Sequence, residues 1–115
     1  MGLLKRRKSD AQGFWATGIA PAEVAENSTY LVKIGREEVI LTRIDDAIFA
    51  FESSCPHAAA DLSNGTLHGG RITCPLHGWK FDVKSGRTLW PEDESCRLTR
   101  YEVRVDSAEV RVRLT

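Results

Sequence analysis

Short runs of β-branched and aromatic residues dominate the middle of the chain. They occupy residues 30–34, 37–44 and 47–52. Runs of this length and composition are typical of β-strands. Only Asp45 and Asp46 separate the second run from the third, and a two-residue polar link between two such runs predicts a tight hairpin.

The last third of the chain predicts two further hairpins. Within residues 97–105 and 109–114, valine and leucine alternate with charged residues, which predicts half-buried strands with one face in water. Residues 79–83 and 87–90 form a second pair of runs. Gly86 lies between these two runs and is expected to supply their turn.

Helical patterns are scarce. Residues 21–28 begin with a proline suited to a first helical turn, but the stretch is short. With 115 residues, of which 42% are hydrophobic, the chain fits one small folded domain. We therefore expect an all-β fold, a small antiparallel barrel or sandwich over residues 13–115. A flexible basic tail over residues 1–12 is expected to precede it.

Charge is unevenly distributed, although the formal net charge is zero. Residues 5–8 read KRRK, so the rest of the chain carries an excess of acidic residues. One terminal basic run without interleaved aromatic residues is typical of a solvated tail, and we expect no nucleic-acid partner. No apolar run approaches the roughly 20 residues of a membrane span, and no secretory signal is recognisable. We therefore expect no membrane partner and a cytoplasmic location.

Two phrases each combine a cysteine with a histidine: CPH begins at Cys55, and CPLH begins at Cys74. Sixteen residues separate the phrases. Three cysteines without an export signal argue against a disulfide framework and leave the thiols free to bind metal. Any one of these four residues would be ordinary alone. Two ordered pairs, with a proline after each cysteine, indicate a metal site.

Two kinds of metal site are compatible with these residues. A structural zinc site accepts two thiolates and two imidazoles in one tetrahedron, but common zinc spacings group cysteine with cysteine and histidine with histidine. Here each phrase supplies one cysteine and one histidine. This arrangement suits two metal ions that are shared between two loops, with the cysteines on one iron and the histidines on the other.

The pattern C-x-H, sixteen residues, C-x-x-H closely resembles the signature of the Rieske [2Fe–2S] family, in which two histidines replace two cysteines on one iron. The similarity continues through the stretches LSNGTL, GGRITC and HGWKFD and covers about residues 30–115. By resemblance, Cys55 and Cys74 bind the buried iron, and His57 and His77 bind the outer iron through Nδ1. The expected cofactor is one [2Fe–2S] cluster.

The resemblance also implies a Rieske-type fold with a cluster-binding subdomain, formed by two loops at about residues 54–92. Several neighbours of the ligands are expected to support this site. Pro56 and Pro75 fix φ and stiffen the loops where backbone amides face sulfur. Gly78 either lets another backbone approach closely or is simply a turn glycine. The supporting set also includes Trp79, and Pro91, which matches the proline-containing loop that covers the cluster in the family.

Charge counting and missing donors predict a reduction potential at the low end of the Rieske range. Two ferric ions, two sulfides, two thiolates and two neutral imidazoles sum to zero charge, so reduction meets less repulsion than in an all-cysteine cluster. Rieske proteins of bc-type complexes add a disulfide and hydroxyl donors. By resemblance, those positions here hold Ala59 or its neighbours, Leu76, Trp79 and Phe81, which supply neither thiol nor hydroxyl. We expect about −150 mV.

Four other features leave alternatives open. Trp90 could shield the cluster, contact a partner or be a core aromatic residue. His68 is expected to be exposed, and Cys96 is expected to be a partly buried free thiol. The acidic run at residues 92–94 is either an ordinary solvated segment or a surface that steers a basic partner.

The resemblance implies a soluble one-electron carrier that is not catalytic alone. The chain has no G-x-G-x-x-G motif and no second histidine–carboxylate group for a catalytic iron, so we expect no small-molecule substrate of its own. It resembles the ferredoxin components of bacterial multicomponent aromatic-ring oxygenases. Their partners are a reductase, expected to be flavin-dependent, and a terminal oxygenase, either an aromatic-ring dioxygenase or a diiron monooxygenase. The alternatives are a Rieske-like small subunit, such as that of nitrite reductase, and a Cys2His2 zinc-binding module.

Overall fold

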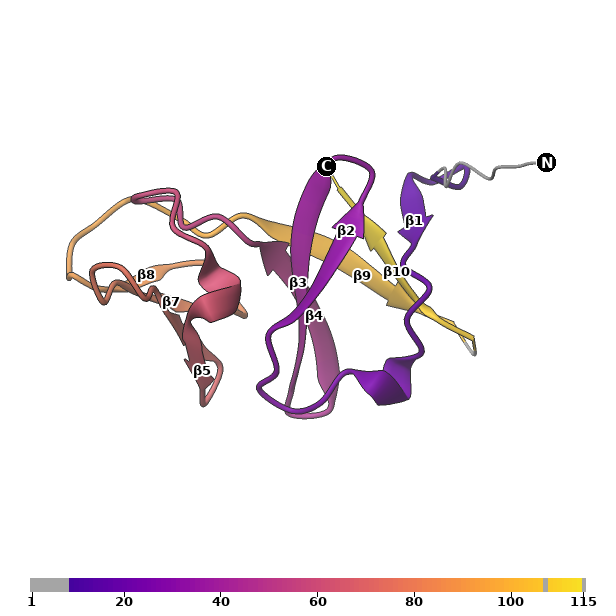
Figure 1. Ribbon diagram of the computed structural model, residues 1–115, viewed down its shortest axis with the longest axis horizontal. Helices are drawn as coiled ribbons and strands as arrows, with labels where there is room; N and C mark the ends of the chain where they lie inside the picture. Colours follow the sequence, from indigo (N-terminus) through magenta and orange to yellow (C-terminus); the bar gives the residue numbers. More distant parts are fainter. Residues whose placement is uncertain (1–8, 107, 115) are drawn as a thin grey trace.

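The computed structural model describes residues 9–106 and 108–114, which form two antiparallel β-sheets (Figure 1). The larger sheet has the strand order β1-β10-β9-β4-β3-β2. Its strands are β1 (Phe14–Ala16), β2 (Tyr30–Ile34), β3 (Glu37–Ile44), β4 (Ala47–Glu52), β9 (Arg100–Val105) and β10 (Val110–Arg113). The smaller sheet has the order β5-β6-β7-β8, with β5 (Thr66–His68), β6 (Arg71–Thr73), β7 (Lys80–Asp82) and β8 (Thr88–Trp90). The expected all-β antiparallel fold is confirmed.

Helical structure in the described part of the chain is confined to two three-residue 3₁₀ turns, η1 (Pro21–Glu23) and η2 (Leu62–Asn64). The stretch 21–28 therefore contributes a single turn that begins at its proline. Over these same described residues, no helix has the length and apolar character that crossing a membrane would require.

The three expected hairpins are present. Asp45 and Asp46 adopt positive φ values of 52° and 70°, the left-handed backbone conformation that a two-residue turn between twisted strands requires. Gly86 has a φ of 81° in the turn between β7 and β8. β9 and β10 pair around a turn of which residue 107 lies outside the described residues.

β3 lies between two hydrophobic cores and is buried on both faces. Val39 and Leu41 point into one core, which they share with buried valines of β10. Ile40 and Ile44 point into the other core, which contains the buried residues of the small sheet. The two faces together explain why this strand is apolar without a clean alternation.

The small sheet is fastened to the large sheet through the second core. Leu67, Ile72 and Phe81 are cross-strand neighbours and share one buried face of the small sheet. They pack in the same cluster as Ile40 of β3 and Phe51 of β4. Full burial of such a side chain contributes about 1.5–3 kcal/mol, so this contact holds the small-sheet lobe in a defined position.

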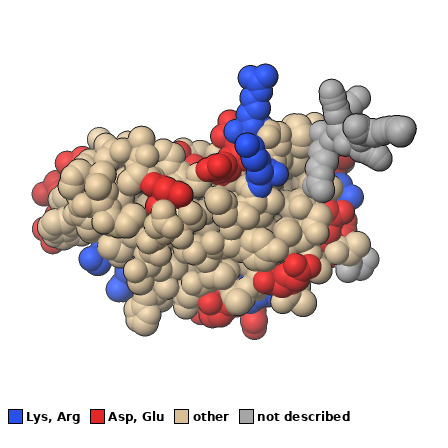
Figure 2. All heavy atoms as spheres, in the orientation of Figure 1, with Lys and Arg blue, Asp and Glu red and all other residues tan. Residues whose placement is uncertain are grey.

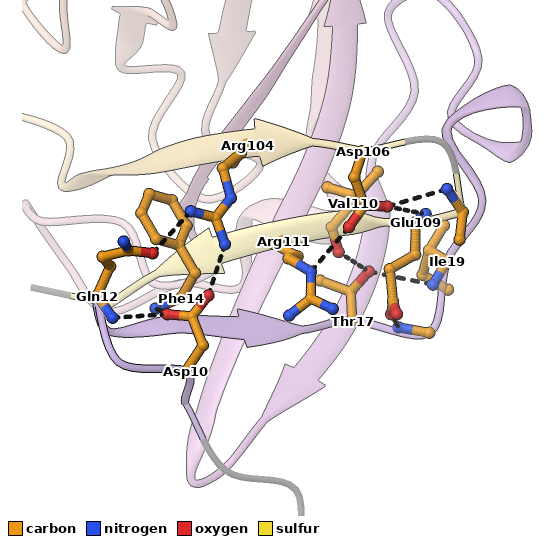
Figure 3. Close-up of polar contacts among 12 residues, drawn as sticks. Asp10, Gln12, Phe14, Thr17, Ile19, Arg104, Asp106, Glu109, Val110 and Arg111 are labelled. Carbon is orange, nitrogen blue, oxygen red and sulfur yellow. Dashed lines mark hydrogen bonds and ion pairs between the residues drawn. The ribbon is translucent and has the colours of Figure 1, made fainter.

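Polar contacts tie β1 to its neighbours (Figure 3). Asp10 accepts a hydrogen bond from the backbone N–H of Phe14 (3.0 Å) and forms an ion pair with Arg104 (2.5 Å). Both partners lower the pKa of Asp10, the backbone of Phe14 most strongly. The guanidinium carbon of Arg104 lies 4.4 Å from the centroid of the Phe14 ring. Past the other end of β1, the hydroxyl of Thr17 donates to the carbonyl of Val110 (2.7 Å).

The tail expected over residues 1–12 is described only in its last part, because residues 1–8 lie outside the described residues. Gln12 belongs to that last part, and its amide oxygen accepts a hydrogen bond from Arg104 (3.1 Å). Together with Asp10, this contact joins the segment before β1 to β9 (Figure 3).

Gly65 is required for close packing beside β6. A Cβ atom at Gly65 would lie 2.3 Å from the carbonyl oxygen of Thr73, although the φ of Gly65 is −82° and is accessible to any residue. We predict that Gly65→Ala lowers the free energy of unfolding by about 3 kcal/mol, because the backbone at Gly65 or at Thr73 must move to admit the new methyl group. Thermal unfolding of the purified protein, followed by circular dichroism, measures the effect.

The matched control is Gly69→Ala. Gly69 has a φ of 58°, and a Cβ atom there would meet nothing within 4 Å. Its cost is therefore only the left-handed conformation, partly offset by the lower entropy of the unfolded chain, about 0.5 kcal/mol net. A Gly65→Ala midpoint equal to or above that of Gly69→Ala would show that the close contact is not limiting.

Candidate metal centre

Two hairpin loops of the same length form the site. The first loop covers residues 55–60 and lies between β4 and η2. The second loop covers residues 74–79 and joins β6 to β7. Antiparallel pairs close both loops at their ends: Ser54 with Asp61, and Thr73 with Lys80.

The backbone hydrogen bonds of the two loops also correspond. In each loop, the cysteine N–H donates to the carbonyl five residues later, and the cysteine carbonyl accepts from the N–H four residues later. The bonds are Cys55 N to Ala60 O (2.8 Å), Ala59 N to Cys55 O (2.8 Å), Cys74 N to Trp79 O (2.7 Å) and Gly78 N to Cys74 O (3.0 Å). The two loops are therefore two copies of one local structure, in which the histidine is third in one copy and fourth in the other.

The fifth residue of each loop has a left-handed backbone. Ala59 has a φ of 54° and Gly78 a φ of 76°. A Cβ atom at Gly78 would meet no protein atom within 4 Å, which favours the alternative of a turn glycine over that of a close backbone approach. The corresponding role of Ala59 could not be inferred from the sequence, because alanine gives no indication of positive φ.

The two cysteines lie inside the fold. Cys55 and Cys74 are each 1% exposed and belong to the core between the two sheets. Burial raises the pKa of the Cys55 thiol, and Cys74 raises it further, because two thiolates would repel each other. The backbone N–H groups of His57 and Ala58 act in the opposite direction, because they face the Cys55 sulfur and stabilise the thiolate. These amides directly follow Pro56 in the chain.

The two histidines form the outer pair of the site. The ring centroids of His57 and His77 are 5.0 Å apart, and the ring planes are inclined at 68°. If metal–nitrogen bonds are about 2 Å long and meet at roughly a tetrahedral angle, two imidazoles on one ion have centroids about 5 Å apart. Nδ1 of His57 is also buried without a hydrogen-bond partner. A bound metal ion would satisfy this atom, so the residues fit an iron site.

The donors are arranged as two pairs, thiols inside and imidazoles outside. Among the residues that the structure describes, no three or more His, Cys, Asp or Glu side chains are grouped to hold a single metal ion. A [2Fe–2S] cluster needs only two protein ligands on each iron, because its sulfides supply the others. The paired arrangement therefore favours a binuclear cluster over the zinc tetrahedron.

Aromatic side chains line the space beside the first histidine. The indole of Trp79 stacks on the imidazole of His57, with centroids 3.9 Å apart and planes inclined at 10°. The Trp79 ring lies in turn 6.3 Å from the ring of Phe81, which is completely buried. The stacking was not predicted, because the sequence does not indicate which ring of the second loop faces the first.

The remaining candidates lie around the two loops. Pro75 is exposed and Pro91 is half-buried after β8. Trp90 is 51% exposed, so the interpretation as a core aromatic residue is wrong. His68 is exposed, and Cys96 is a half-buried free thiol, both as expected. Burial raises the pKa of the Cys96 thiol, and nearby carboxylates add to this effect.

The acidic run follows β8 in the loop that closes the small-sheet lobe. Glu92, Asp93 and Glu94 are all exposed. In the view of Figure 2, acidic side chains lie at the outer end of this lobe, and basic side chains appear along its lower edge. The run is therefore a solvated surface at the same end of the molecule as Trp90.

Comparison with known proteins gives consistent results. The chain matches the Rieske [2Fe–2S] domain over residues 14–105. The ferredoxin component of a naphthalene 1,2-dioxygenase system from Pseudomonas aeruginosa is 32% identical over 102 residues, which cover 88% of this chain and 96% of the relative.

Two solved structures are similar in fold. A chain from the complex of reduced oxygenase and oxidized ferredoxin in carbazole 1,9a-dioxygenase has a TM-score of 0.73 and 33% identity, covering 82% of this chain and 96% of that one. A protein assigned as a nitrite reductase NADPH small subunit has a TM-score of 0.68 and 28% identity, covering 83% and 93%.

Two matched loops with thiols inside and imidazoles outside define a class of iron–sulfur proteins with mixed ligands. The sequence match makes the assignment specific, and the chain belongs to the Rieske [2Fe–2S] domain family. Membership implies one Rieske-type [2Fe–2S] cluster. The chain is an electron-transfer component and not a catalyst on its own.

Because Ala59 and Gly78 occupy corresponding positions, exchanging the residue type at each should change the free energy of unfolding in opposite directions. Ala59→Gly removes the left-handed strain of about 1–2 kcal/mol but raises the conformational entropy of the unfolded chain. The expected net effect is a stabilisation of about 0.5 kcal/mol. Gly78→Ala should destabilise by a similar amount. Thermal unfolding of both variants and of the double variant measures this, and the double variant should return close to the wild type. A double variant as unstable as Gly78→Ala alone would contradict the equivalence of the loops.

Proposed function

We propose that the protein is a one-electron carrier that delivers electrons to a terminal oxygenase. The observation that carries this proposal is the pair of matched loops, in which the two cysteines are buried and the two histidines form the outer pair. When bound, a [2Fe–2S] cluster supplies reversible one-electron chemistry at a site where protein and sulfide occupy every ligand position. Such a site leaves no position for a substrate.

The proposed ligands are Cys55, His57, Cys74 and His77. Core side chains around the thiols exclude water from the inner iron position. The backbone amides that face Cys55 stabilise its thiolate, and an equivalent backbone turn holds Cys74. Nδ1 of His57 is already free of protein partners, as a ligand atom must be.

We also propose the partners and the location. A ferredoxin in complex with its oxygenase is among the similar structures, which supports a terminal oxygenase as electron acceptor. The ferredoxin relative belongs to a naphthalene dioxygenase system, which favours an aromatic-ring dioxygenase over a diiron monooxygenase. A flavin-dependent reductase is the proposed donor. The three free thiols suit a reducing compartment, so the cytoplasm is the proposed location.

A small subunit of a nitrite reductase is the second candidate. Its support is the fold similarity to a protein of that assignment, which is weaker in both identity and TM-score than the similarity to the oxygenase–ferredoxin complex. Purification of the protein on its own distinguishes the two proposals. An electron carrier should accept and donate electrons as a separate protein, whereas a subunit should require the rest of its enzyme.

The proposed function predicts transfer of one electron per protein. The purified protein, reduced with dithionite and freed of excess reductant, is mixed under argon with oxidised terminal oxygenases of naphthalene and carbazole dioxygenase systems. Stopped-flow absorbance should show oxidation of this protein as an oxygenase is reduced. A reduced protein that transfers no electron to either oxygenase would contradict the proposed acceptor class.

The ligand assignment predicts a change in potential on substitution of either histidine. Protein-film voltammetry of the wild type should give a midpoint near −150 mV, because neither Trp79 nor Phe81 offers a hydroxyl donor to the cluster. His57→Cys and His77→Cys add a negative charge, so each should move the midpoint toward about −400 mV or lose the cluster. His68→Cys is the control and should change nothing. An unchanged electron paramagnetic resonance spectrum in His57→Cys or His77→Cys would refute the assignment.

A further inference from the structure

The two histidines of the site differ in their exposure. His77 is exposed, whereas His57 is half-buried. The two loops share one backbone structure, but His57 is the third residue of its loop and His77 is the fourth, so their side chains leave the loops at different positions. Trp79 contributes to the burial of His57, because its indole stacks on the imidazole at a centroid distance of 3.9 Å and covers one of its faces.

Trp79 is itself held from two directions. Its backbone carbonyl accepts the hydrogen bond from the N–H of Cys74 (2.7 Å), which closes the second loop. Its ring packs against the ring of Phe81, which is completely buried and lies on β7, paired with β6. The indole is therefore part of a supported stack that runs from the core to the surface.

The contact crosses between the loops. Trp79 belongs to the second loop, and His57 belongs to the first, so the side chain of one loop orients the imidazole of the other. The orientation leaves Nδ1 of His57 buried and unpartnered. His77 directly follows Leu76 in the second loop, and Leu76 is an exposed apolar side chain with 57% of its surface accessible.

We propose that Trp79 is a positioning residue that holds and covers His57, and thereby leaves His77 as the imidazole presented to a protein partner. This inference rests on the proposed function, because it assumes that both histidines are ligands. It assigns unequal roles to two residues that the ligand pattern treats alike: His57 is the enclosed ligand, and His77, beside exposed Leu76, is the contact ligand.

Chemical modification of the iron-loaded, oxidised protein tests the inference. Diethylpyrocarbonate acylates accessible imidazole nitrogens, and peptide mapping by mass spectrometry gives a rate for each histidine. His77 should react several times faster than His57 in the wild type, with exposed His68 as the internal reference. In Trp79→Ala, the rate of His57 should rise toward that of His77. In Trp79→Phe, which retains a ring, the wild-type ratio should be largely restored.

Trp90→Ala is the matched control. Trp90 is an exposed indole on the neighbouring strand β8, and its removal should leave the ratio of the two rates unchanged. Equal reactivity of His57 and His77 in the wild type would overturn the inference, even if Trp79→Ala fails to fold. An unchanged ratio in a folded Trp79→Ala protein would also overturn it.

Pulsed electron paramagnetic resonance supplies a second readout on the same samples. Two nitrogen couplings are expected from the reduced wild type, and Trp79→Ala should alter one of them while Trp79→Phe alters neither. Unchanged couplings in folded Trp79→Ala would contradict the positioning role. A protein without a [2Fe–2S] signal would instead contradict the proposed function, whereas the signal with equal histidine reactivity would contradict this inference alone.

Discussion

The site depends on one backbone arrangement that is used twice. Each of the two loops that carry the cysteines and histidines is a six-residue turn, closed by the cysteine N–H at one end and by a pair of bridged strand residues outside it. Both cysteine amides close their loops, and both thiols lie in the core between the two sheets, which removes them from water. The histidines, one position apart in their respective loops, then form the outer pair. The order of cysteine inside and histidine outside therefore accompanies the same turn in both loops.

The core between the two sheets gives this arrangement its rigidity. β3 is buried on both faces and contributes side chains to both cores. It therefore links the packing of the small sheet to the packing within the large sheet. Gly65 adds a close backbone contact with Thr73, which directly precedes Cys74. The position of the second loop is therefore fixed by the packing of Gly65 against Thr73 and by the pairing of β6 with β7. Few local adjustments could move Cys74 and His77 without disturbing the core.

The sequence predicts much of this architecture, for identifiable reasons. The two aspartates between β3 and β4 and the glycine between β7 and β8 specify their turns locally, so these hairpins follow from neighbouring residues alone. The cysteine and histidine spacing indicates the metal centre, because mixed ligands in two phrases suit a shared cluster. The left-handed conformation of Ala59 could not be predicted, because hydrogen bonds of the whole loop impose it against the preference of alanine. The stacking of Trp79 on His57 depends on tertiary packing between two loops and leaves no local pattern.

The different attachments of the two loops have a mechanical consequence. The first loop continues from the end of β4 in the large sheet, whereas the second loop lies within the small sheet. A group bound by both loops therefore acts as a cross-link between the two halves of the molecule, much as a disulfide bridge would. Its binding free energy is added to the cohesion of the two sheets, since separating them would require breaking metal–ligand bonds. Loss of the bound group would remove this cross-link and leave the core between the two sheets as the contact that holds them together.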